Sequence, residues 1–207
     1  MTTADPVATA SELLIGSKNP DKVAEIQALL ADLEITVRSL DEFDVPDVEE
    51  TGESFAVNAG LKASVFALST GLLTVSDDSG LCVDALGGDP GVYSARYAGE
   101  GCSYQDNIDK LLENLKGVPS DQRTAQFIAV LACAAPDGSV RFTVEGLVEG
   151  YITDEPRGTK GFGYDPVFYY PPLRKTFAEM EPEEKNRISH RANALGAFRE
   201  TFLQLRT

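Results

Sequence analysis

The chain has 207 residues, of which 43% are hydrophobic, so it can bury a sizeable core and is not expected to be disordered. Its formal net charge of −15 disfavours binding to a nucleic-acid backbone, which requires a basic surface. The three cysteines lie far apart, with no CxxC or Cys/His cluster, which is typical of a reducing cytoplasm without disulfides or a zinc site. The N-terminus has no signal-peptide pattern, and no apolar run approaches the roughly 18 residues of a membrane span.

The first half of the sequence predicts alternating strands and helices. The predicted elements are a strand over 11–16, a helix over 17–32, a strand over 34–40, an acidic loop over 41–53, a helix over 54–69 and a strand over 71–76. The second half continues with a strand over 80–86, a turn cluster over 87–91, a helix over 103–117, a hairpin over 124–153, an aromatic loop or strand over 162–172 and a final helix over 182–206. This order predicts an α/β fold with a mixed sheet, and two lobes are possible.

The segment SKNPDK, residues 17–22, lies between the first predicted strand and helix. A helix N-terminus presents free N–H groups to an anion, and Ser17, Asn19 and Lys22 add side-chain donors. The segment matches neither GxxxxGK[ST] nor GxGxxG, the standard phosphate-binding loops. Taken alone, it is better explained by an ordinary capped helix with surface lysines.

Glu49 and Glu50 precede a tight turn, and Lys62 lies in the middle of the next predicted helix. Two glutamates at such a turn could hold a metal ion. Taken alone, they are better explained as part of an acidic loop, and Lys62 as a solvated lysine whose stem covers the core.

Asp77 and Asp78 stand side by side at the end of an apolar run and are followed by Ser79 and Gly80. Successive side chains of a strand point to opposite faces, so both aspartates can serve one site only if the chain turns there. We expect a turn at Ser79–Gly80, with one carboxylate on a hard cation such as Mg²⁺ and the other beside it. An Asx-turn at a strand end is the alternative, although it needs only one aspartate.

Two later stretches carry aromatic and basic side chains. In GFGYDPVF, residues 161–168, Phe162 and Tyr164 offer faces on which a base could stack, or they form part of the core. His190 and Arg191 could donate hydrogen bonds to a ligand carbonyl, or they lie on a helix surface. Residues 157–191 hold seven bases against five acids, which on charge alone is better explained by a mixed-charge surface than by an anion site.

Taken together and in this order, five segments resemble the inosine triphosphate pyrophosphatase family over about residues 12–205. The segments are SKNPDK, EETGESFAVNAGLKA, SDDSGLCVDALGGDPGVYSARYAG, GFGYDPVF and EKNRISHRANAL. The resemblance implies an elongated α/β fold in which helices flank a mixed sheet and two lobes surround a central substrate cleft, usually as a homodimer. We therefore expect residues 11–207 to form a single two-lobed catalytic domain after a flexible tail over residues 1–10.

The resemblance also implies an activity. Enzymes of this family use Mg²⁺ to cleave non-standard purine nucleoside triphosphates (ITP, dITP and XTP) between the α- and β-phosphates, which yields the monophosphate and pyrophosphate and cleanses the nucleotide pool. The implied partner is a purine nucleoside triphosphate, with no nucleic-acid polymer and no membrane.

Position by position, the resemblance assigns roles to residues. Asp78 matches the general base and metal ligand, Asp77 lies beside it, Lys62 matches a phosphate-contacting lysine, and Glu50 matches a second metal ligand. The substrate-binding set comprises the triphosphate loop, one further contact, the base-stacking segment and three residues near the purine: Ser17, Lys18, Asn19, Pro20, Asp21 and Lys22; Ser79; Phe162, Gly163, Tyr164 and Asp165; Lys185, His190 and Arg191.

Val57 departs from the family pattern, which usually has a glutamate at this position. We expect activity to survive, because Glu50, Asp77 and Asp78 are present. The alternatives are a Maf-like nucleotide pyrophosphatase, a nucleotide-binding module without catalysis, and a phosphatase that releases inorganic phosphate. A Maf-like enzyme should lack the SHR and GYDP segments, and the missing DxDxT signature disfavours a phosphatase of the haloacid-dehalogenase type.

Overall fold

The structure is a computed structural model and describes residues 5–31 and 35–206. The chain divides into two compact units. Unit 1 comprises Met1–Asp78, Ala129–Gly146 and Arg191–Thr207, and unit 2 comprises Ser79–Ile128 and Leu147–His190. Among the described helices, none has both the length and the apolar character that crossing a membrane requires.

Seven strands form one mixed sheet in the order β2-β1-β3-β4-β5-β6-β7. Their bounds are β1 Glu12–Ile15, β2 Thr36–Ser39, β3 Leu73–Val83, β4 Thr124–Ala134, β5 Val140–Ile152, β6 Phe168–Tyr170 and β7 Lys175–Thr176. β1 is parallel to β2 and β3, whereas β6 is antiparallel to β5 and β7. The predicted mixed sheet is therefore confirmed.

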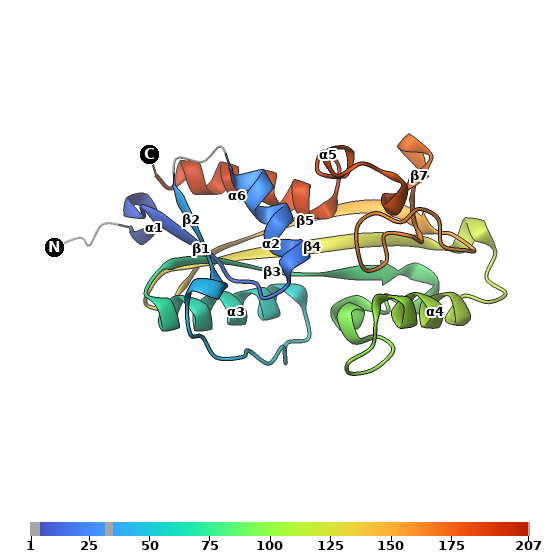
Figure 1. The fold of residues 1–207 in the computed structure, drawn as a ribbon, viewed down its shortest axis with the longest axis horizontal. Helices are drawn as coiled ribbons and strands as arrows, with labels where there is room; N and C mark the ends of the chain where they lie inside the picture. The colour runs from blue at the N-terminus through green and yellow to red at the C-terminus, as the bar shows by residue number, and fades with distance from the viewer. Residues whose placement is uncertain (1–4, 32–34, 207) are drawn as a thin grey trace. The chain divides into compact units, whose positions relative to one another are not determined.

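Within the described residues, six α-helices accompany the sheet. Their bounds are α1 Pro6–Thr9, α2 Pro20–Leu30, α3 Phe55–Thr70, α4 Tyr104–Asn114, α5 Pro182–Lys185 and α6 His190–Gln204. The short 3₁₀ helices are Leu40–Glu42, Asp84–Leu86, Gly91–Arg96, Ser120–Gln122, Pro171–Leu173 and Phe177–Glu179. In unit 1, α3 lies on one face of the sheet, and α2 and α6 lie on the other (Figure 1).

Most predicted elements occur where the sequence placed them. α4 begins with a capping box, in which the Ser103 hydroxyl accepts from the Asp106 amide and the Asp106 carboxylate accepts from the Ser103 amide. The predicted hairpin consists of β4 and β5, which are adjacent in the sheet and joined by a tight turn at residues 135–139.

Three sequence predictions need correction. The two strands predicted over 71–76 and 80–86 are one strand, β3, so there is no turn at Ser79–Gly80. The single helix predicted over 182–206 is broken at residues 186–189, where Asn186 and Ser189 are weak helix formers.

The third correction concerns the N-terminal segment. Residues 5–10 are not a free tail, because Asp5 is the N-cap of α1 and Val7 is fully buried. Arg141 pairs with Asp5 at 2.9 Å, and Arg206 donates to the Ala10 carbonyl at 2.6 Å. The remainder of the predicted tail, residues 1–4, lies outside the described residues, as do parts of the predicted elements at 32–34.

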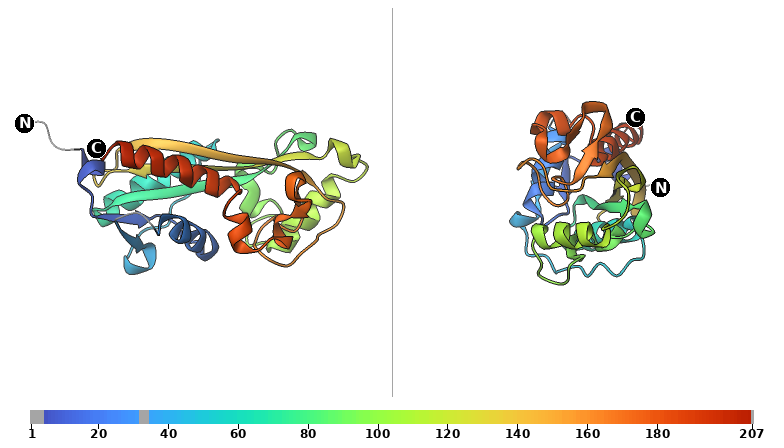
Figure 2. Two further views of the ribbon diagram at one scale, coloured as in Figure 1. Left: turned by 90° about the horizontal axis from the view of Figure 1, so that it is seen from above. Right: turned by 90° about the vertical axis from the view of Figure 1, so that its right-hand side faces the viewer.

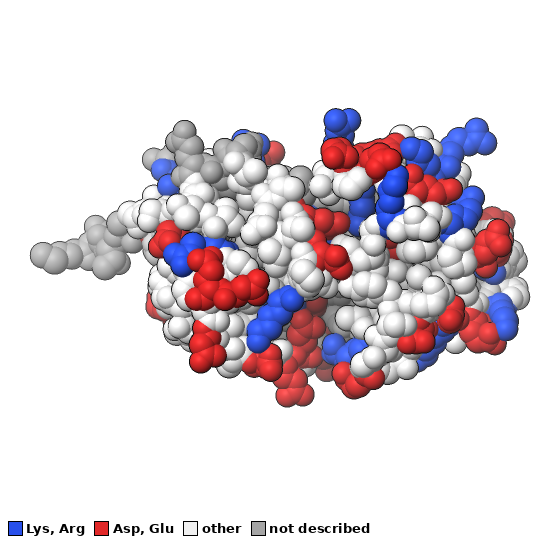
Figure 3. All heavy atoms as spheres, in the orientation of Figure 1, with Lys and Arg blue, Asp and Glu red and all other residues white. Residues whose placement is uncertain are grey.

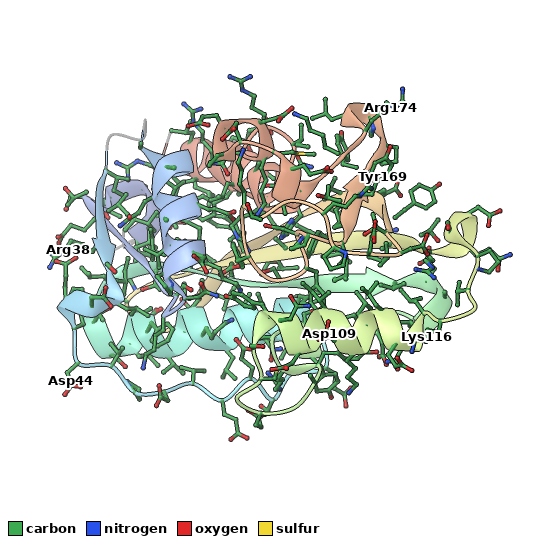
Figure 4. All side chains as sticks on the ribbon, turned by 45° about the vertical axis from the view of Figure 1, so that its right-hand side comes forward. Arg38, Asp44, Asp109, Lys116, Tyr169 and Arg174 are labelled. Atoms are coloured by element: carbon green, nitrogen blue, oxygen red, sulfur yellow. The ribbon has the colours of Figure 1, made fainter. Side chains whose placement is uncertain are left out.

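Each unit has its own hydrophobic core. In unit 1, α6 runs along the β4–β5 hairpin (Figure 2) and packs Phe198 and Phe202 against strand residues such as Leu131. In unit 2, Phe127, Phe168 and Phe177 are in mutual ring contact at the centre of the core. Also in unit 2, Asp109 of α4 and Lys116, which follows α4, are exposed to solvent (Figure 4).

The basic stretch of the sequence forms a mixed-charge surface in unit 2. Lys and Arg side chains gather over α5 and β7 with acidic side chains among them (Figure 3). Lys160 pairs with Glu181 and Lys175 with Glu184. These pairs agree with the mixed-charge interpretation, because each one offsets the charge of a lysine with that of a glutamate.

Two Gly→Ala substitutions should have opposite effects on stability. A Cβ at Gly16 would lie 2.1 Å from the buried Ser76 Oγ and 3.0 Å from the Phe66 ring, so Gly16→Ala should destabilise by about 1–3 kcal/mol. Gly196 is exposed in α6 with nothing near its absent Cβ, so Gly196→Ala should stabilise by about 0.4–1 kcal/mol. Urea unfolding of both variants measures the difference, and equal free energies of unfolding would contradict the close approach at Gly16.

Candidate functional site

The candidate site of unit 1 lies where β3 extends beyond β1. The last strand contact of β1 is the bond from the Gly16 amide to the Val75 carbonyl, at 2.7 Å. β1 then leads into residues 17–19 and α2, while β3 continues to Asp77 and Asp78. The carboxyl ends of parallel strands are where α/β proteins bind ligands, so this edge is the place to look for chemistry.

Asp77 faces the α2 and α6 side of the sheet. Its carboxylate is fully buried, lies 3.0 Å from Lys22 Nζ and is also paired with Arg191, at 3.5 Å. Arg191 makes a second ion pair with Glu25 of α2. Although burial opposes ionisation, the positive charges of Lys22, Arg191 and Lys62 hold the pKa of Asp77 well below its usual range. Asp77 is therefore ionised, and its ion pairs with Lys22 and Arg191 hold it in place.

Asp78 faces the α3 side. Its Oδ2 accepts a hydrogen bond from Asn58 Nδ2 at 3.0 Å, and its Oδ1 lies 3.6 Å from Lys62 Nζ. The same ammonium group is paired with Glu50. Burial raises the pKa of Asp78 above its usual value despite Lys62, and the nearby Glu50 carboxylate adds to the rise.

The two aspartates differ in their charge balance. The Asp77 side holds two carboxylates and two cations, so it is neutral without a ligand. The Asp78 side holds two carboxylates, from Glu50 and Asp78, against the single ammonium of Lys62. Opposite charge stabilises the surplus carboxylate, so the Asp78 side is where a further cation fits.

The oxygen donors on the Asp78 side are the kind that Mg²⁺ prefers. In residues 5–31 and 35–206, no three His, Cys, Asp or Glu side chains form a metal cage. Mg²⁺ usually takes one or two carboxylates, with substrate phosphates and water completing the shell. Glu50 and Asp78 already converge on one positive charge, that of Lys62, so the donor set fits a metal that is completed by its substrate.

The loop at the start of α2 is held by its own side chains. Asn19 Oδ1 accepts from the amides of Asp21 and Lys22, and Ser17 Oγ accepts from the Asn19 amide at 3.3 Å. Asn19 therefore acts as the N-cap of α2. Lys18 is exposed and pairs with Asp47 at 2.7 Å.

Val57 lies on the first turn of α3, and its side chain is directed at the loop before the helix. The residue is 57% exposed, and its Cγ1 would be 2.7 Å from a Cβ at Gly52. Val57 thus packs on the backbone that follows Glu50. The next residue, Asn58, is the one that contacts Asp78.

In unit 2, the predicted base-stacking segment is organised by Asp165. Its Oδ2 accepts from Lys185 Nζ at 2.7 Å and from the Phe162 amide at 3.0 Å. Lys185 Nζ also lies 4.9 Å from the centre of the Phe162 ring, a cation–π distance. Asp165 and Lys185 are both buried, so this pair fixes the position of Phe162.

Tyr164 and His190 occupy different surroundings from Phe162. Tyr164 is buried in the unit 2 core and donates to the Ser94 carbonyl at 2.9 Å, so its ring is a core group as well as part of the segment. His190 stacks on Phe127 with ring centres 4.7 Å apart, which fixes the plane of the imidazole.

Unit 2 also has a cavity of about 540 Å³ that none of the predicted site residues lines. Its lining residues include Tyr151, Tyr169 (Figure 4), Asp121, Asp154 and Glu155. The lining also includes Arg157, so the cavity has three carboxylates against one cation, a balance that disfavours the phosphate end of a nucleotide.

Lysines and carboxylates at the carboxyl ends of parallel strands define a phosphate-binding type of α/β protein. The chain belongs to the Ham1 family, whose model matches residues 13–201. It is 53% identical over 195 residues to the dITP/XTP pyrophosphatase of Geobacillus kaustophilus, covering 94% of this chain and 95% of that protein. The resemblance drawn from the five segments is confirmed.

Solved structures of Ham1 proteins have the same fold. A HAM1 protein from Coxiella burnetii is 44% identical, with a TM-score of 0.86 over 93% of this chain and 98% of that chain. The Staphylococcus aureus Ham1 protein is 42% identical, with a TM-score of 0.80 over the same shares of the two chains.

The structure brings the predicted residues together in two groups. Lys22, Glu50, Lys62, Asp77 and Asp78 lie in unit 1, and Phe162, Asp165, Lys185 and His190 lie in unit 2. Arg191 was predicted near the purine, and its guanidinium pairs with Glu25 and Asp77 in unit 1. Sequence reasoning missed Asn58 and Glu25. Asn58 stands four residues before Lys62, so helical spacing could have revealed it.

The same substitution at the two neighbouring aspartates should affect stability differently. Asp77→Asn leaves Lys22 without its buried counter-charge and Arg191 with Glu25 alone, and it should destabilise by about 3–5 kcal/mol. Asp78→Asn removes a carboxylate whose ionisation burial disfavours, and should change stability by less than about 1 kcal/mol. Urea unfolding near pH 7 measures both.

The pH dependence gives the check on this contrast. Because the folded pKa of Asp77 is lowered, its contribution is present above the unfolded value of about 3.9 and is lost as the pH falls further. The difference between the wild type and Asp77→Asn should therefore shrink below about pH 4. If the difference in the free energy of unfolding between the wild type and Asp77→Asn stays constant down to pH 3, the Asp77 carboxylate is not stabilised in its ionised form by the fold.

Proposed function

We propose that this protein hydrolyses non-standard purine nucleoside triphosphates, of the dITP, ITP and XTP type, to the monophosphate and pyrophosphate. The observation that carries the proposal is the convergence of Glu50 and Asp78 on Lys62 at the end of the parallel strands. Its support from known proteins is 53% identity to a dITP/XTP pyrophosphatase over nearly the whole chain. The Maf-like alternative and a module without catalysis are not favoured by this family membership.

Unit 1 supplies the groups for the phosphates. Lys22 and Lys62 are fixed by buried carboxylates, and the start of α2 adds the positive end of its dipole. Fixed positive charge stabilises the negative charge that develops on the leaving pyrophosphate. Ser17 and Lys18 belong to the same loop and would contact the outer phosphates.

Glu50 and Asp78 would hold the divalent cation, for which we propose Mg²⁺. When bound, Mg²⁺ would neutralise charge on the phosphate oxygens. Asp78 would also orient the attacking water and accept its proton. We assign this role to Asp78 because the Asp77 carboxylate is fully buried and committed to Lys22 and Arg191. Asp77 then acts by positioning Lys22.

Unit 2 supplies the groups for the base. The Phe162 ring, held by Lys185 and Asp165, offers a stacking face. Hydrogen-bond donors from Lys185 and His190 would match the 6-oxo group of hypoxanthine and xanthine, whereas adenine presents an amino group there. A mismatched base would leave buried polar groups unpaired, which costs about 1–3 kcal/mol each.

The homodimer, the cytoplasmic location and the single catalytic domain over residues 11–207 are further parts of this proposal. They follow from the family resemblance and the cysteine pattern.

Product analysis tests the function directly. The protein is incubated with ITP, XTP, GTP or ATP and Mg²⁺, and phosphate is assayed with and without added inorganic pyrophosphatase. We expect phosphate from ITP and XTP only when the helper enzyme is present, because cleavage occurs between the α- and β-phosphates. Phosphate without the helper would indicate a phosphatase, and no phosphate in either assay would indicate a binding module.

Asp78→Asn should lower kcat/KM for ITP by about 10²–10⁴-fold, because it removes the proton acceptor and one metal-holding carboxylate. Circular dichroism should show an unchanged fold. Asp109→Asn, the same substitution on the outer side of α4, is the control and should retain full activity. Full activity of Asp78→Asn would exclude the assignment.

A further inference from the structure

Asn58 is a fully buried polar residue on the first turn of α3 that the activity described above does not use. Its side chain makes two hydrogen bonds in opposite directions. Asn58 Oδ1 accepts from the Gly52 amide at 2.7 Å, and Asn58 Nδ2 donates to Asp78 Oδ2 at 3.0 Å. One end of the amide therefore holds the loop that carries Glu50, and the other end holds Asp78.

The polarity of these two contacts matches an asparagine. The backbone N–H of Gly52 can only donate, so it requires an oxygen, and the Asp78 carboxylate accepts, so it requires an N–H. Aspartate would place a third carboxylate beside Asp78, and leucine would leave both partners unsatisfied. A buried polar group without its partner costs more than the bond itself contributes.

Gly52 has no side chain that would prevent its contact with Asn58. A Cβ at Gly52 would lie 2.6 Å from Asn58 Oδ1 and 2.7 Å from Val57 Cγ1, closer than real Cβ contacts allow. The absence of a side chain is therefore what lets the loop backbone reach the asparagine. Since Glu50 is two residues before Gly52, this approach fixes the part of the loop from which Glu50 extends to Lys62.

We infer that Asn58 is a positioning residue that sets the spacing of the Glu50 and Asp78 carboxylates for a divalent cation. The inference rests on the proposed function, because it takes these two carboxylates as the metal-holding pair. Groups that hydrogen-bond to metal-binding carboxylates orient them, and their loss typically costs 10- to 100-fold in metal affinity. Asn58 would act through Asp78 and the loop without touching the substrate.

The test compares Asn58→Leu with Asn107→Leu. Asn107 is also buried on a helix and bridges in the same way, accepting from the Ala98 amide at 2.7 Å and donating to the Ala95 carbonyl at 3.2 Å. Its partners are these two backbone groups and the Cys102 thiol, 3.2 Å from Oδ1, all in unit 2. Asn107→Leu therefore carries a comparable structural cost but touches no carboxylate.

The first readout is Mn²⁺ binding to the full chain without nucleotide, measured by electron paramagnetic resonance of the free ion. Asn58→Leu should weaken Mn²⁺ binding about 10- to 100-fold, and Asn107→Leu should leave it unchanged. The second readout is the Mg²⁺ dependence of ITP hydrolysis, in which high Mg²⁺ should recover much of the rate of Asn58→Leu. If Asn58→Leu does not fold, Gly52→Ala disturbs the same link and should also weaken Mn²⁺ binding.

Unchanged Mn²⁺ affinity in Asn58→Leu, or an equal loss in Asn107→Leu, would overturn the inference while leaving the hydrolysis of ITP intact. An unmodified protein that does not bind Mn²⁺ would also overturn it. Conversely, weakened Mn²⁺ binding in a protein that hydrolyses neither ITP nor XTP would support the role of Asn58 and reject the proposed function.

Discussion

The strict alternation of side chains along β3 is the constraint on which the site depends. Because the strand runs without interruption through Asp77 and Asp78, the two carboxylates must face opposite sides of the sheet. The fold has helices on both sides, so each carboxylate meets a different set of partners. Asp77 meets α2 and α6, and Asp78 meets α3. Two adjacent residues of the same type thereby acquire different chemistry from their surroundings alone.

The difference between them is one of electrical balance. Asp77 and Glu25 are matched by Lys22 and Arg191, which makes a neutral buried cluster that joins α2 to α6 and holds Lys22 in place. On the opposite face, Lys62 must serve both Glu50 and Asp78. The surplus negative charge therefore lies on the Asp78 side of β3. Under the proposed function, Asp77 is the structural carboxylate and Asp78 is the one that takes part in the chemistry.

Much of the fold could be predicted because local signals were strong, such as the capping box of α4 and the apolar runs of β1 and β4. The motif order identified the family. The sequence could not show that β3 continues past Ser79, since Ser-Gly is a usual turn signal and the neighbouring strand β4 comes from a distant part of the chain. Nor could it place Arg191 against Glu25, because their separation of 166 residues leaves no local pattern.

The acidic segment 41–53, which holds seven acidic and no basic residues, lies beside the loop that starts α2, as the Lys18–Asp47 pair shows. For a negatively charged ligand, these carboxylates form an electrostatic barrier on the approach to Lys22. A free triphosphate feels this repulsion more strongly than its metal complex, which carries less net charge. The encounter itself should therefore favour the metal complex, and dissolved salt, by screening the repulsion, should speed association of the free triphosphate.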